Sequence, residues 1–593
     1  MVAGIVLVLM TWAVSILALA GLGSVLLSGL RASVDEAGTR LGWLRWRIGP
    51  SLWWGLGAAV VLIESLGLLL PLRSALVAGV IGTLALLSVI AGVVRVTRGR
   101  WMPTRKRSSS AASRAVGIAL AAAAAMVLIV LAAAALGPVT NYDSGLYHLG
   151  AIAYAGDAPT IPGLANLYFP FGYSTSTFPV AAFLGNGPWA GQGFRLLNGL
   201  LIAMALLDLL LRFRRPRPTV GAWILLTGLS VALVPLLWMP DYWVTSPTSD
   251  TGVMVLTLVS AAYLADALQG RRSWIIPGTT AALLAVILTT MRPLMAVYAA
   301  VVIVILGALA VRRRSAGQVW GLAMFAVVTI VIAAVQTARD IVLSGWVQYP
   351  LSLFPVQVPW RAADPVLNRT ATLGAARDPG DLWNAAHDWQ WVLPWVRRLP
   401  TQWEFPLLVA LGLGLLVLVL IVRAAGRQLP ARRVLVSLSP AVITALVWFL
   451  ASPPSFRFAW GPLFAMLVIP IGWALFVLAG VTEGPWRRTG SLVVSVAAVG
   501  LTLLGLLSLG LRVHPWTPRP DVLAWQLGGV SIDLPAVLPP IVSTHLLSLD
   551  SGLVVRVPAD SDQCWAVYPL CTPQVDMSVT TRGSELAAGF APE

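Results

Sequence analysis

The chain has 593 residues, of which 58% are hydrophobic and only 11% are charged, whereas soluble chains carry about 25% charged residues. This composition excludes a soluble globular protein, because a fold of this size could not hide so much apolar surface, and it also excludes a disordered chain. It is typical of a membrane protein with a dozen or more helices of about 20 residues. The net charge of +16 is almost all arginine. In a membrane protein such charge indicates cytoplasmic loops, so we expect no nucleic-acid partner.

Apolar runs of roughly spanning length recur along the chain, and they predict an all-α polytopic membrane protein with about fourteen transmembrane helices. The first run has no basic segment before it and is followed directly by Arg31, so we expect an anchor and not a cleaved signal peptide. The fourteen predicted spans are 3–30, 52–70, 74–94, 115–137, 196–211, 220–238, 251–268, 275–291, 293–311, 318–338, 404–422, 434–451, 459–479 and 489–511.

The distribution of basic residues predicts the orientation. Seven short alternate loops hold 26 of the 40 Lys and Arg residues, and the positive-inside rule makes these loops cytoplasmic. We therefore expect a multi-pass protein of the cell (plasma) membrane with both termini outside. Three longer polar segments then fall on the extracytoplasmic side, at 138–195, 339–403 and 512–593.

This pattern divides the chain into three predicted parts: N-terminal transmembrane helices (1–114), a transmembrane core (115–511) and an extracytoplasmic C-terminal cap (512–593). Short alternating runs such as 552–557 predict some strand in the cap, so we expect it to be small and of mixed α/β structure. Cys564 and Cys571 are the only cysteines. They are too few for a disulfide framework or a zinc cluster, but in an oxidising compartment we expect them to pair with each other.

Two acidic residues stand where long extracytoplasmic loops meet spans. Asp143 follows a span closely and precedes Tyr147 and His148, a setting that suits general-base chemistry on a hydroxyl group. A solvated loop carboxylate is the alternative. Asp250 stands at the outer mouth of another span, where it could also act only as a helix N-cap. A divalent cation shared by Asp143, Asp250 and His148 is a further alternative.

Three arginines, Arg292, Arg339 and Arg457, are predicted at the outer ends of spans. A guanidinium group in that position needs an anion, and phosphate suits its planar set of donors. Pairing with a carboxylate of the same chain or with a lipid headgroup is the alternative. The sequence contains no P-loop, GxSxG elbow, HExxH motif or zinc-ligand spacing, which argues against an ATP-driven pump and the common hydrolases.

An extracytoplasmic acid after a span, a helix in the membrane plane and many spans with short loops together resemble the GT-C glycosyltransferases. The chain is more closely similar to an uncharacterised bacterial family of multi-spanning GT-C-like proteins. It departs from that family's pattern in having Arg339-Asp340 where Arg-Asn is expected, and Pro453-Pro454-Ser455 before Arg457 where an acid is expected. The stretches that carry the resemblance are 142–148, 161–172, 246–250, 339–345 with 349–350, 562–565 and 569–573.

The resemblance implies an enzyme that transfers a sugar from a polyprenyl-phosphate donor to a cell-envelope glycan or lipid acceptor, with inversion at the anomeric carbon. Asp143 would be the catalytic base, and Arg292, Arg339 and Arg457 would hold the phosphate. His148, Tyr147 and Asp250 would contact substrate. The other partners would be membrane lipids, and the sugar and the oligomeric state are left open. A transporter or flippase of lipid-linked sugars and a non-catalytic assembly subunit are the alternatives.

Overall fold

The computed structural model describes most of the chain. The described residues are 2–29, 40–98, 111–189, 191–214, 218–270, 274–313, 318–351, 353–480, 496, 499–500, 502–507, 521–527 and 530–592.

The chain is an all-α polytopic membrane protein. In lipid, every backbone polar group must be satisfied internally, which helices achieve within one segment. Twelve helical segments of the described residues are long and apolar enough to cross a membrane. They are α1 (Val2–Gly29), α2 (Arg40–Gly67), α3 (Ala75–Arg98), α4 (Ala111–Ala134), α8 (Leu197–Phe213, with η5, Gly193–Arg195, before it), α9 (Val220–Trp238), α10 (Ser249–Gln269), α12 (Met295–Arg312), α13 (Gln318–Ser344), α17 (Glu404–Ala424), α18 (Ala431–Ala451) and α19 (Trp460–Ala479, with η8, Phe456–Ala459, before it).

Two of the fourteen predicted spans are not among these twelve. Helix α11 (Ile275–Met291) is apolar but has only 17 residues, and 489–511 lies largely outside the described residues. The number fourteen therefore stays a prediction.

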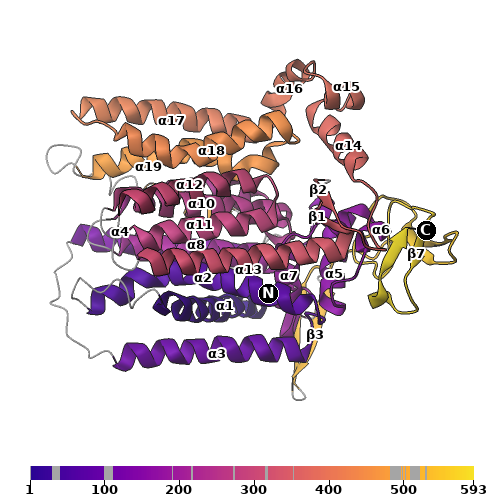
Figure 1. Cartoon of the computed structure of the whole chain (residues 1–593). Coiled ribbons are helices and arrows are strands. Elements are labelled where there is room, and N and C mark those ends of the chain that lie inside the picture. Colours follow the sequence, from indigo (N-terminus) through magenta and orange to yellow (C-terminus); the bar gives the residue numbers. More distant parts are fainter. Residues whose placement is uncertain are drawn as a thin grey trace.

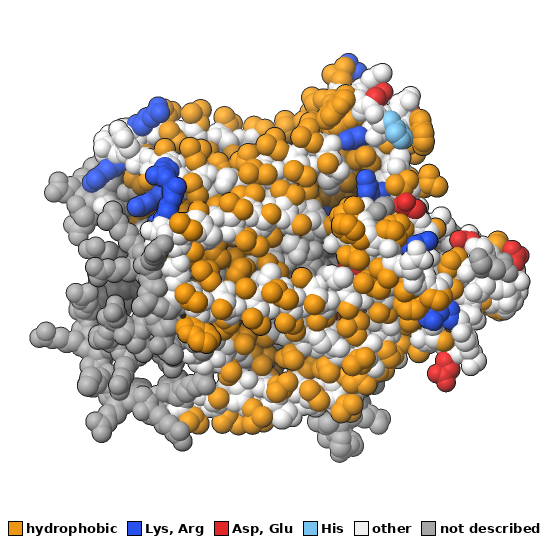
Figure 2. All heavy atoms as spheres, in the orientation of Figure 1, with side chains coloured by type: hydrophobic (Ala, Val, Ile, Leu, Met, Phe, Trp, Pro, Cys, Tyr) orange, Lys and Arg blue, Asp and Glu red, His pale blue; other side chains and the backbone are white. Residues whose placement is uncertain are grey.

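Helix α10 forms the centre of the bundle. Nearly all of its residues are buried, and it packs against α9, α11 and α19. By contrast, few residues of α3, α13 and α17 are buried inside the bundle, as expected for helices that face lipid. Figure 2 shows hydrophobic side chains over the middle of the visible face, with acidic side chains only toward the end that carries the C-terminal segment.

The described parts of the three long polar segments gather at one end of the bundle (Figure 1). Both chain termini lie at this end, whereas α17 and α18 are joined at the opposite end. The first segment contains short helices: η2 (Ser144–His148), α5 (Leu149–Asp157), α6 (Leu164–Leu167), η3 (Phe169–Gly172), α7 (Thr177–Leu184) and η4 (Gly187–Trp189). The second contains the hairpin β1 (Trp346–Gln348) and β2 (Leu353–Pro355), then α14 (Val366–Arg377), α15 (Leu382–His387), α16 (Val392–Arg398) and η7 (Leu399–Thr401).

The C-terminal segment is made of antiparallel two-stranded sheets. In register, Asp521 pairs with Ala536 in the first sheet, Thr544 with Pro558 in the second and Val579 with Pro592 in the third. Its elements are β3 (Asp521–Leu527), β4 (Val530–Ala536), β5 (Thr544–Ser548), β6 (Val554–Pro558), β7 (Val579–Thr581), η10 (Leu586–Ala588) and β8 (Phe590–Pro592).

The predicted orientation can be tested by cysteine labelling, because the structure contains no free cysteine among its described residues. Arg427 and Asp550 are both exposed. Arg427 lies in the connection between α17 and α18, and Asp550 lies between β5 and β6 of the C-terminal segment, which is at the opposite end of the bundle. We expect a membrane-impermeant maleimide to label Asp550→Cys in intact cells and to label Arg427→Cys only after permeabilisation. Labelling of Arg427→Cys in intact cells would contradict the predicted orientation and indicate the opposite one.

Candidate functional site

The two acidic loops form one hydrogen-bonded unit at the end of the bundle. The backbone N–H groups of Thr140 and Asn141 both donate to Ser246 Oγ, at 3.1 Å. The hydroxyl of Thr245 donates to the carbonyl of Ala134, at the end of α4, at 2.7 Å. Residues 140–143 therefore keep a defined position relative to η6 (Asp241–Thr245) and the start of α10, although they follow a different span.

A buried side chain of α8, Asn198, holds the loop between η6 and α10 in place. Asn198 Nδ2 lies 3.2 Å from the carbonyl oxygens of Trp243 and Ser246 and 3.0 Å from that of Thr248. Asn198 is 1% exposed, so these contacts satisfy carbonyl groups that water would not reach. These contacts fix the backbone of the loop at the point where α10 begins.

Asp143 lies in an ion pair with one of the predicted arginines. Arg457 Nη1 donates to Asp143 Oδ2 at 2.8 Å, and the two side chains are 28% and 20% exposed. The N–H of Asp143 donates to Asn141 Oδ1 at 3.0 Å, which fixes the backbone beneath the carboxylate. Asp143 is thus oriented and still open to a ligand.

Asp250 forms a second and more buried ion pair with Arg292. Its side chain is 3% exposed, and that of Arg292 is 16% exposed. The N-cap of α10 is Thr248, whose hydroxyl accepts from the N–H of Asp250 at 3.2 Å. The alternative that Asp250 is only an N-cap is therefore wrong, since its carboxylate contacts a guanidinium group.

One aromatic ring joins the two ion pairs. The guanidinium carbon of Arg292 lies 4.6 Å from the centroid of Phe458, and that of Arg457 lies 5.0 Å from the same centroid. These distances are within the range of cation–π attraction. Asp143, Arg457, Asp250 and Arg292 thus form one cluster with two positive and two negative charges, and we call it the double ion pair.

His148 and Tyr147 line the buried side of the double ion pair. Their rings meet edge to face at 4.4 Å, and the Ser144 hydroxyl lies 3.1 Å from His148 Nδ1. Burial lowers the pKa of His148 from 6.5 to about 4, although Asp143 and Asp250 oppose this change. Burial also raises the pKa of Tyr147 well above 10. Both groups are therefore neutral at pH 7.

Arg339, the third predicted phosphate ligand, belongs to a different group of side chains. It lies on α13, where Nη1 donates to the carbonyl of Thr175 at 3.1 Å and is 3.7 Å from Glu64 Oε1. The side chain is only 6% exposed. The structure thus brings Arg292 and Arg457 to Asp143 and pairs Arg339 with a carboxylate of α2 instead. The two groups are neighbours through Tyr173, which contacts Tyr147 at 5.6 Å between ring centroids.

The described residues offer no group of three His, Cys, Asp or Glu side chains placed to hold a metal ion. Asp143 and Asp250 each face a guanidinium group, which supplies positive charge where a metal would otherwise do so. A divalent cation at this site stays an untested alternative.

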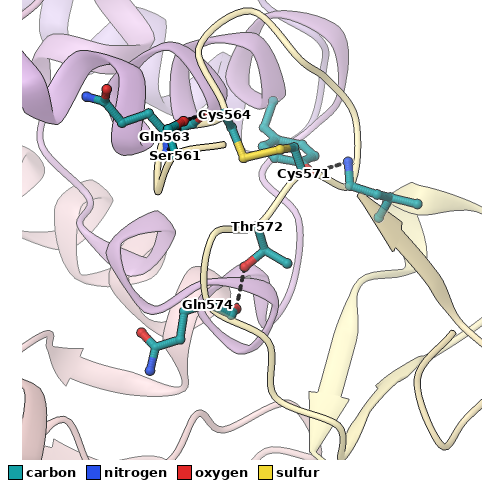
Figure 3. Close-up of a disulfide and its surroundings, with 8 residues drawn as sticks. Ser561, Gln563, Cys564, Cys571, Thr572 and Gln574 are labelled. Atoms are coloured by element: carbon teal, nitrogen blue, oxygen red, sulfur yellow. Dashed lines mark hydrogen bonds between the residues drawn. A yellow bond between two sulfur atoms is a disulfide. The ribbon is translucent and has the colours of Figure 1, made fainter. Parts of the chain in front are cut away.

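The C-terminal segment covers the loop that carries Asp143. Its disulfide joins Cys564 and Cys571 (Figure 3), the pair expected from the sequence. Residues before the bridge contact Tyr142, whose hydroxyl bonds to Asp562 and whose carbonyl accepts from Gln563 Nε2 at 2.7 Å. The hydrogen bond to Asp562 raises the pKa of Tyr142 to about 12.

Further contacts come from residues inside the loop that the bridge closes. The N–H of Trp565 donates to the carbonyl of Gly145 at 2.9 Å, and a Cβ at Gly145 would lie only 2.5 Å from the Trp565 ring. The N–H of Leu570 donates to the Tyr154 hydroxyl at 3.0 Å. The disulfide loop therefore fits against the 142–154 segment, and glycine at position 145 is needed for this close approach.

Several residues of this site were missed by sequence reasoning. Phe458 and Asn198 are not among the site residues predicted from the sequence, and Asn198 lies inside an apolar run. Asn198 had one usable signal, because an amide inside a spanning helix must find partners. Phe458 carries no such signal, since the Arg292 that it contacts is distant in sequence. Asp562 and Gln563 belong to the 562–565 stretch that carries the family resemblance, but no local pattern predicts their contact with Tyr142.

The chain matches the family model described as "Domain of unknown function (DUF8201)" over residues 5–464. This match covers most of the chain, which therefore belongs to that family. No curated protein and no solved structure matches the chain.

The low pKa of His148 predicts a pH dependence of stability. In the unfolded chain the imidazole binds a proton near pH 6.5, but in the folded chain only near pH 4. Above about pH 6.5 the imidazole is neutral in both states and does not lower the free energy of unfolding. As pH falls toward 4, only the unfolded chain binds the proton, and the free energy of unfolding falls by about 3 kcal/mol. We expect His148→Gln to remove this part of the acid destabilisation in thermal unfolding of purified protein. The exposed His387 provides the control: His387→Gln should behave like the wild type, and an unchanged pH profile in His148→Gln would contradict the prediction.

Loss of the disulfide should loosen the Asp143 loop. In the chain-entropy model a bridge across so short a loop stabilises the fold by about 2–3 kcal/mol. We expect Cys564→Ser/Cys571→Ser to raise hydrogen exchange at amides 142–154, while those of α14, on another segment, serve as the internal reference. Unchanged protection of 142–154 would show that the bridge does not support this loop.

Proposed function

We propose that this protein is an integral-membrane glycosyltransferase of the GT-C type. It would transfer a sugar from a polyprenyl-phosphate donor to a cell-envelope glycan or lipid acceptor on the extracytoplasmic face. The observation that carries the proposal is the double ion pair. It sets a partly exposed carboxylate beside two guanidinium groups that share the Phe458 ring, at the end of a helix bundle where a lipid-linked donor can arrive.

The charges of the double ion pair suit exchange with a phosphate group. A phosphate carries three acceptor oxygens and favours planar guanidinium donors. When it binds Arg457 and Arg292, it competes with the carboxylates of Asp143 and Asp250 for the same donors. Asp143 is the more exposed of the two acids, so it is the one that phosphate can most readily displace. Donor binding would then free Asp143 to accept a proton.

The reaction follows from this arrangement. The acceptor hydroxyl attacks the anomeric carbon from the side opposite the phosphate, and its proton passes to Asp143. The new C–O bond forms as the bond between the anomeric carbon and the phosphate oxygen breaks, with its electron pair going to the phosphate. Arg457 and Arg292 stabilise the charge that develops on this leaving group. Attack from the opposite side inverts the anomeric centre.

Aromatic side chains around the double ion pair support a sugar site. Tyr147 contacts Tyr173 and Phe178, and Tyr242 contacts Trp243 at 4.4 Å between centroids. Burial raises the pKa values of Tyr147 and Tyr242, so their hydroxyl groups stay protonated and can bond to sugar hydroxyls. The donor is a lipid-linked sugar in this proposal because nucleotide sugars are not expected outside the cytoplasm.

The decisive variant is Asp143→Asn. It keeps the size of the side chain and removes the base, and loss of a general base typically lowers the rate by a factor of about 100 to 10,000. We expect that loss in transfer from a panel of polyprenyl-phosphate sugars by purified protein in nanodiscs. Asp157→Asn is the matched control, because Asp157 lies in the same segment and pairs with Arg73 at 2.5 Å, away from the double ion pair.

The same set of variants separates the rival functions. Arg457→Lys keeps the charge but loses the planar donors, so it should weaken binding of polyprenyl monophosphate measured by thermal shift. A flippase would tolerate Asp143→Asn in a vesicle translocation assay while still suffering from Arg457→Lys. An assembly subunit would tolerate both changes. Transfer at the wild-type rate by Asp143→Asn would exclude the catalytic assignment.

A further inference from the structure

Two buried clusters in this protein have the same formal charge and different surroundings. Each contains one arginine and two carboxylic acids. One lies between α8 and α10 and consists of Arg212, Asp208 and Asp266. The other lies between α2 and α13 and consists of Arg339, Glu64 and Asp340. If all groups are ionised, each cluster carries one uncompensated negative charge.

The Arg212 cluster supplies a donor to each of its four carboxylate oxygens. Arg212 Nε donates to Asp208 Oδ1 at 3.0 Å, and Trp53 Nε1 donates to Asp208 Oδ2 at 3.0 Å. Arg212 Nη1 donates to Asp266 Oδ2 at 2.5 Å, and the N–H of Gly221 donates to Asp266 Oδ1 at 2.8 Å. Carboxylates held by this many donors can remain ionised when buried.

The Arg339 cluster lacks such donors. Both oxygens of Glu64 and one oxygen of Asp340 are buried without a protein hydrogen bond, as is the side-chain oxygen of Gln336. Glu64 and Asp340 are each 1% exposed. The 3.7 Å between Glu64 Oε1 and Arg339 Nη1 is too long for a hydrogen bond. The cluster therefore contains four acceptor atoms that need a hydrogen or a cation.

No other charged group among the described residues compensates this negative charge. Within the described residues, the charged group that acts on Glu64 is Arg339, and those that act on Asp340 are Arg339 and Glu64. Of the elements that pack on α2 and α13, the helices α1, α6, α7, α11 and η3 and the strand β1 contain no titratable side chain. Helix α3 carries Arg95 and Arg98 only in its last turn, at the end opposite its connection with α2. Asp208 and Arg212 of α8 meet α2 at Trp53, about three helical turns before Glu64. Ser174, which donates to Asp340 Oδ1, is neutral, and so is the phenol of Tyr173 before it.

We infer that Glu64 and Asp340 form a proton-binding site that holds one proton between them. An uncompensated charge in a low-dielectric interior is costly, and a carboxyl group removes that cost by binding a proton. The proton also turns one orphaned acceptor into an O–H donor. Gln336 precedes Asp340 by one helical turn of α13, so its orphaned oxygen lies on the same face and can accept this hydrogen bond.

The site lies beside the proposed sugar-transfer site. Ser174 bonds to Asp340 and Gln336, and Thr175 accepts from Arg339. The residue before them, Tyr173, contacts Tyr147 of the candidate site. Loss of the proton would leave a negative charge beneath the 173–175 segment. The inference does not depend on glycosyl transfer, because it rests on charge and hydrogen bonding alone.

Infrared difference spectroscopy tests the site directly, since a protonated carboxyl group has a C=O stretch that a carboxylate lacks. We expect purified wild-type protein at pH 7 to show a buried protonated-acid band. Glu64→Gln and Asp340→Asn should each lose this band, because the one remaining acid ionises to pair with Arg339. Retention of the band in both variants would overturn the proposal, and so would absence of a band that depends on these residues in the wild type.

The Arg212 cluster provides the matched control. Asp208→Asn should leave the protonated-acid band unchanged and should lower the melting temperature, because it removes an ionised partner of Arg212. By contrast, Glu64→Gln and Asp340→Asn should melt near the wild-type temperature at pH 7, and the double variant should melt well below either. A melting temperature that rises with Na⁺ concentration at constant ionic strength, and loses this dependence in both single variants, would identify a sodium site and contradict a proton site.

Discussion

Charge inside a membrane-spanning bundle must be paired, and the arrangement of this protein's site depends on how four arginines meet that requirement. Arg457, Arg292, Arg339 and Arg212 each contact a carboxylate from a different helix or loop. An unpaired ion in a low-dielectric interior is costly, so each pair holds its two elements together. Asp143 and Arg457 are 314 positions apart, and their contact joins the first long segment to the start of α19.

The Arg212 cluster, the Arg339 cluster and the double ion pair differ in exposure to solvent, and this difference indicates different roles. The Arg212 cluster is deeply buried and fully hydrogen bonded, as expected of charges that hold two helices together. The pair of Asp143 and Arg457 is partly open, and so it can exchange one partner for a ligand. The Arg339 cluster is closed to solvent and short of donors, which suits proton binding better than phosphate binding. The proposed chemistry therefore uses Arg292 and Arg457 and leaves Arg339 beside the site.

Hydrogen bonds between neutral groups fix the position of the ion pair between Asp143 and Arg457. Ser246 and Thr245 tie the loop of Asp143 to the loop of Asp250, and the disulfide loop packs on Tyr142 and Gly145. Arg195 extends this support, because it donates to the carbonyl of Gly137 at 2.5 Å and also to that of Val537, directly after β4 of the C-terminal segment. Asp143 is thus held in place by segments that come from separate parts of the chain.

The sequence by itself determined the class of fold, the positions of most helices and the region that holds the candidate site. These properties are local: a run of about 20 apolar residues must be helical in lipid, and an acid next to such a run must lie near its end. Asp143, Asp250, Arg292 and Arg457 could therefore be proposed together as extracytoplasmic residues. The two cysteines could be proposed as partners because no others exist.

Only the tertiary structure decided which charge meets which. Arg339 resembles Arg457 in sequence terms, since both stand at the end of an apolar run, yet packing of α13 on α2 gives Arg339 to Glu64. Phe458 lies under two guanidinium groups because Arg292, which follows α11, meets η8, the short helix before α19 that carries Arg457 and Phe458. Thr248, and not Asp250, caps α10 because the loop supported by Asn198 sets where the helix begins. Such pairings depend on the relative position of helices hundreds of residues apart, and no local pattern of residues encodes that position.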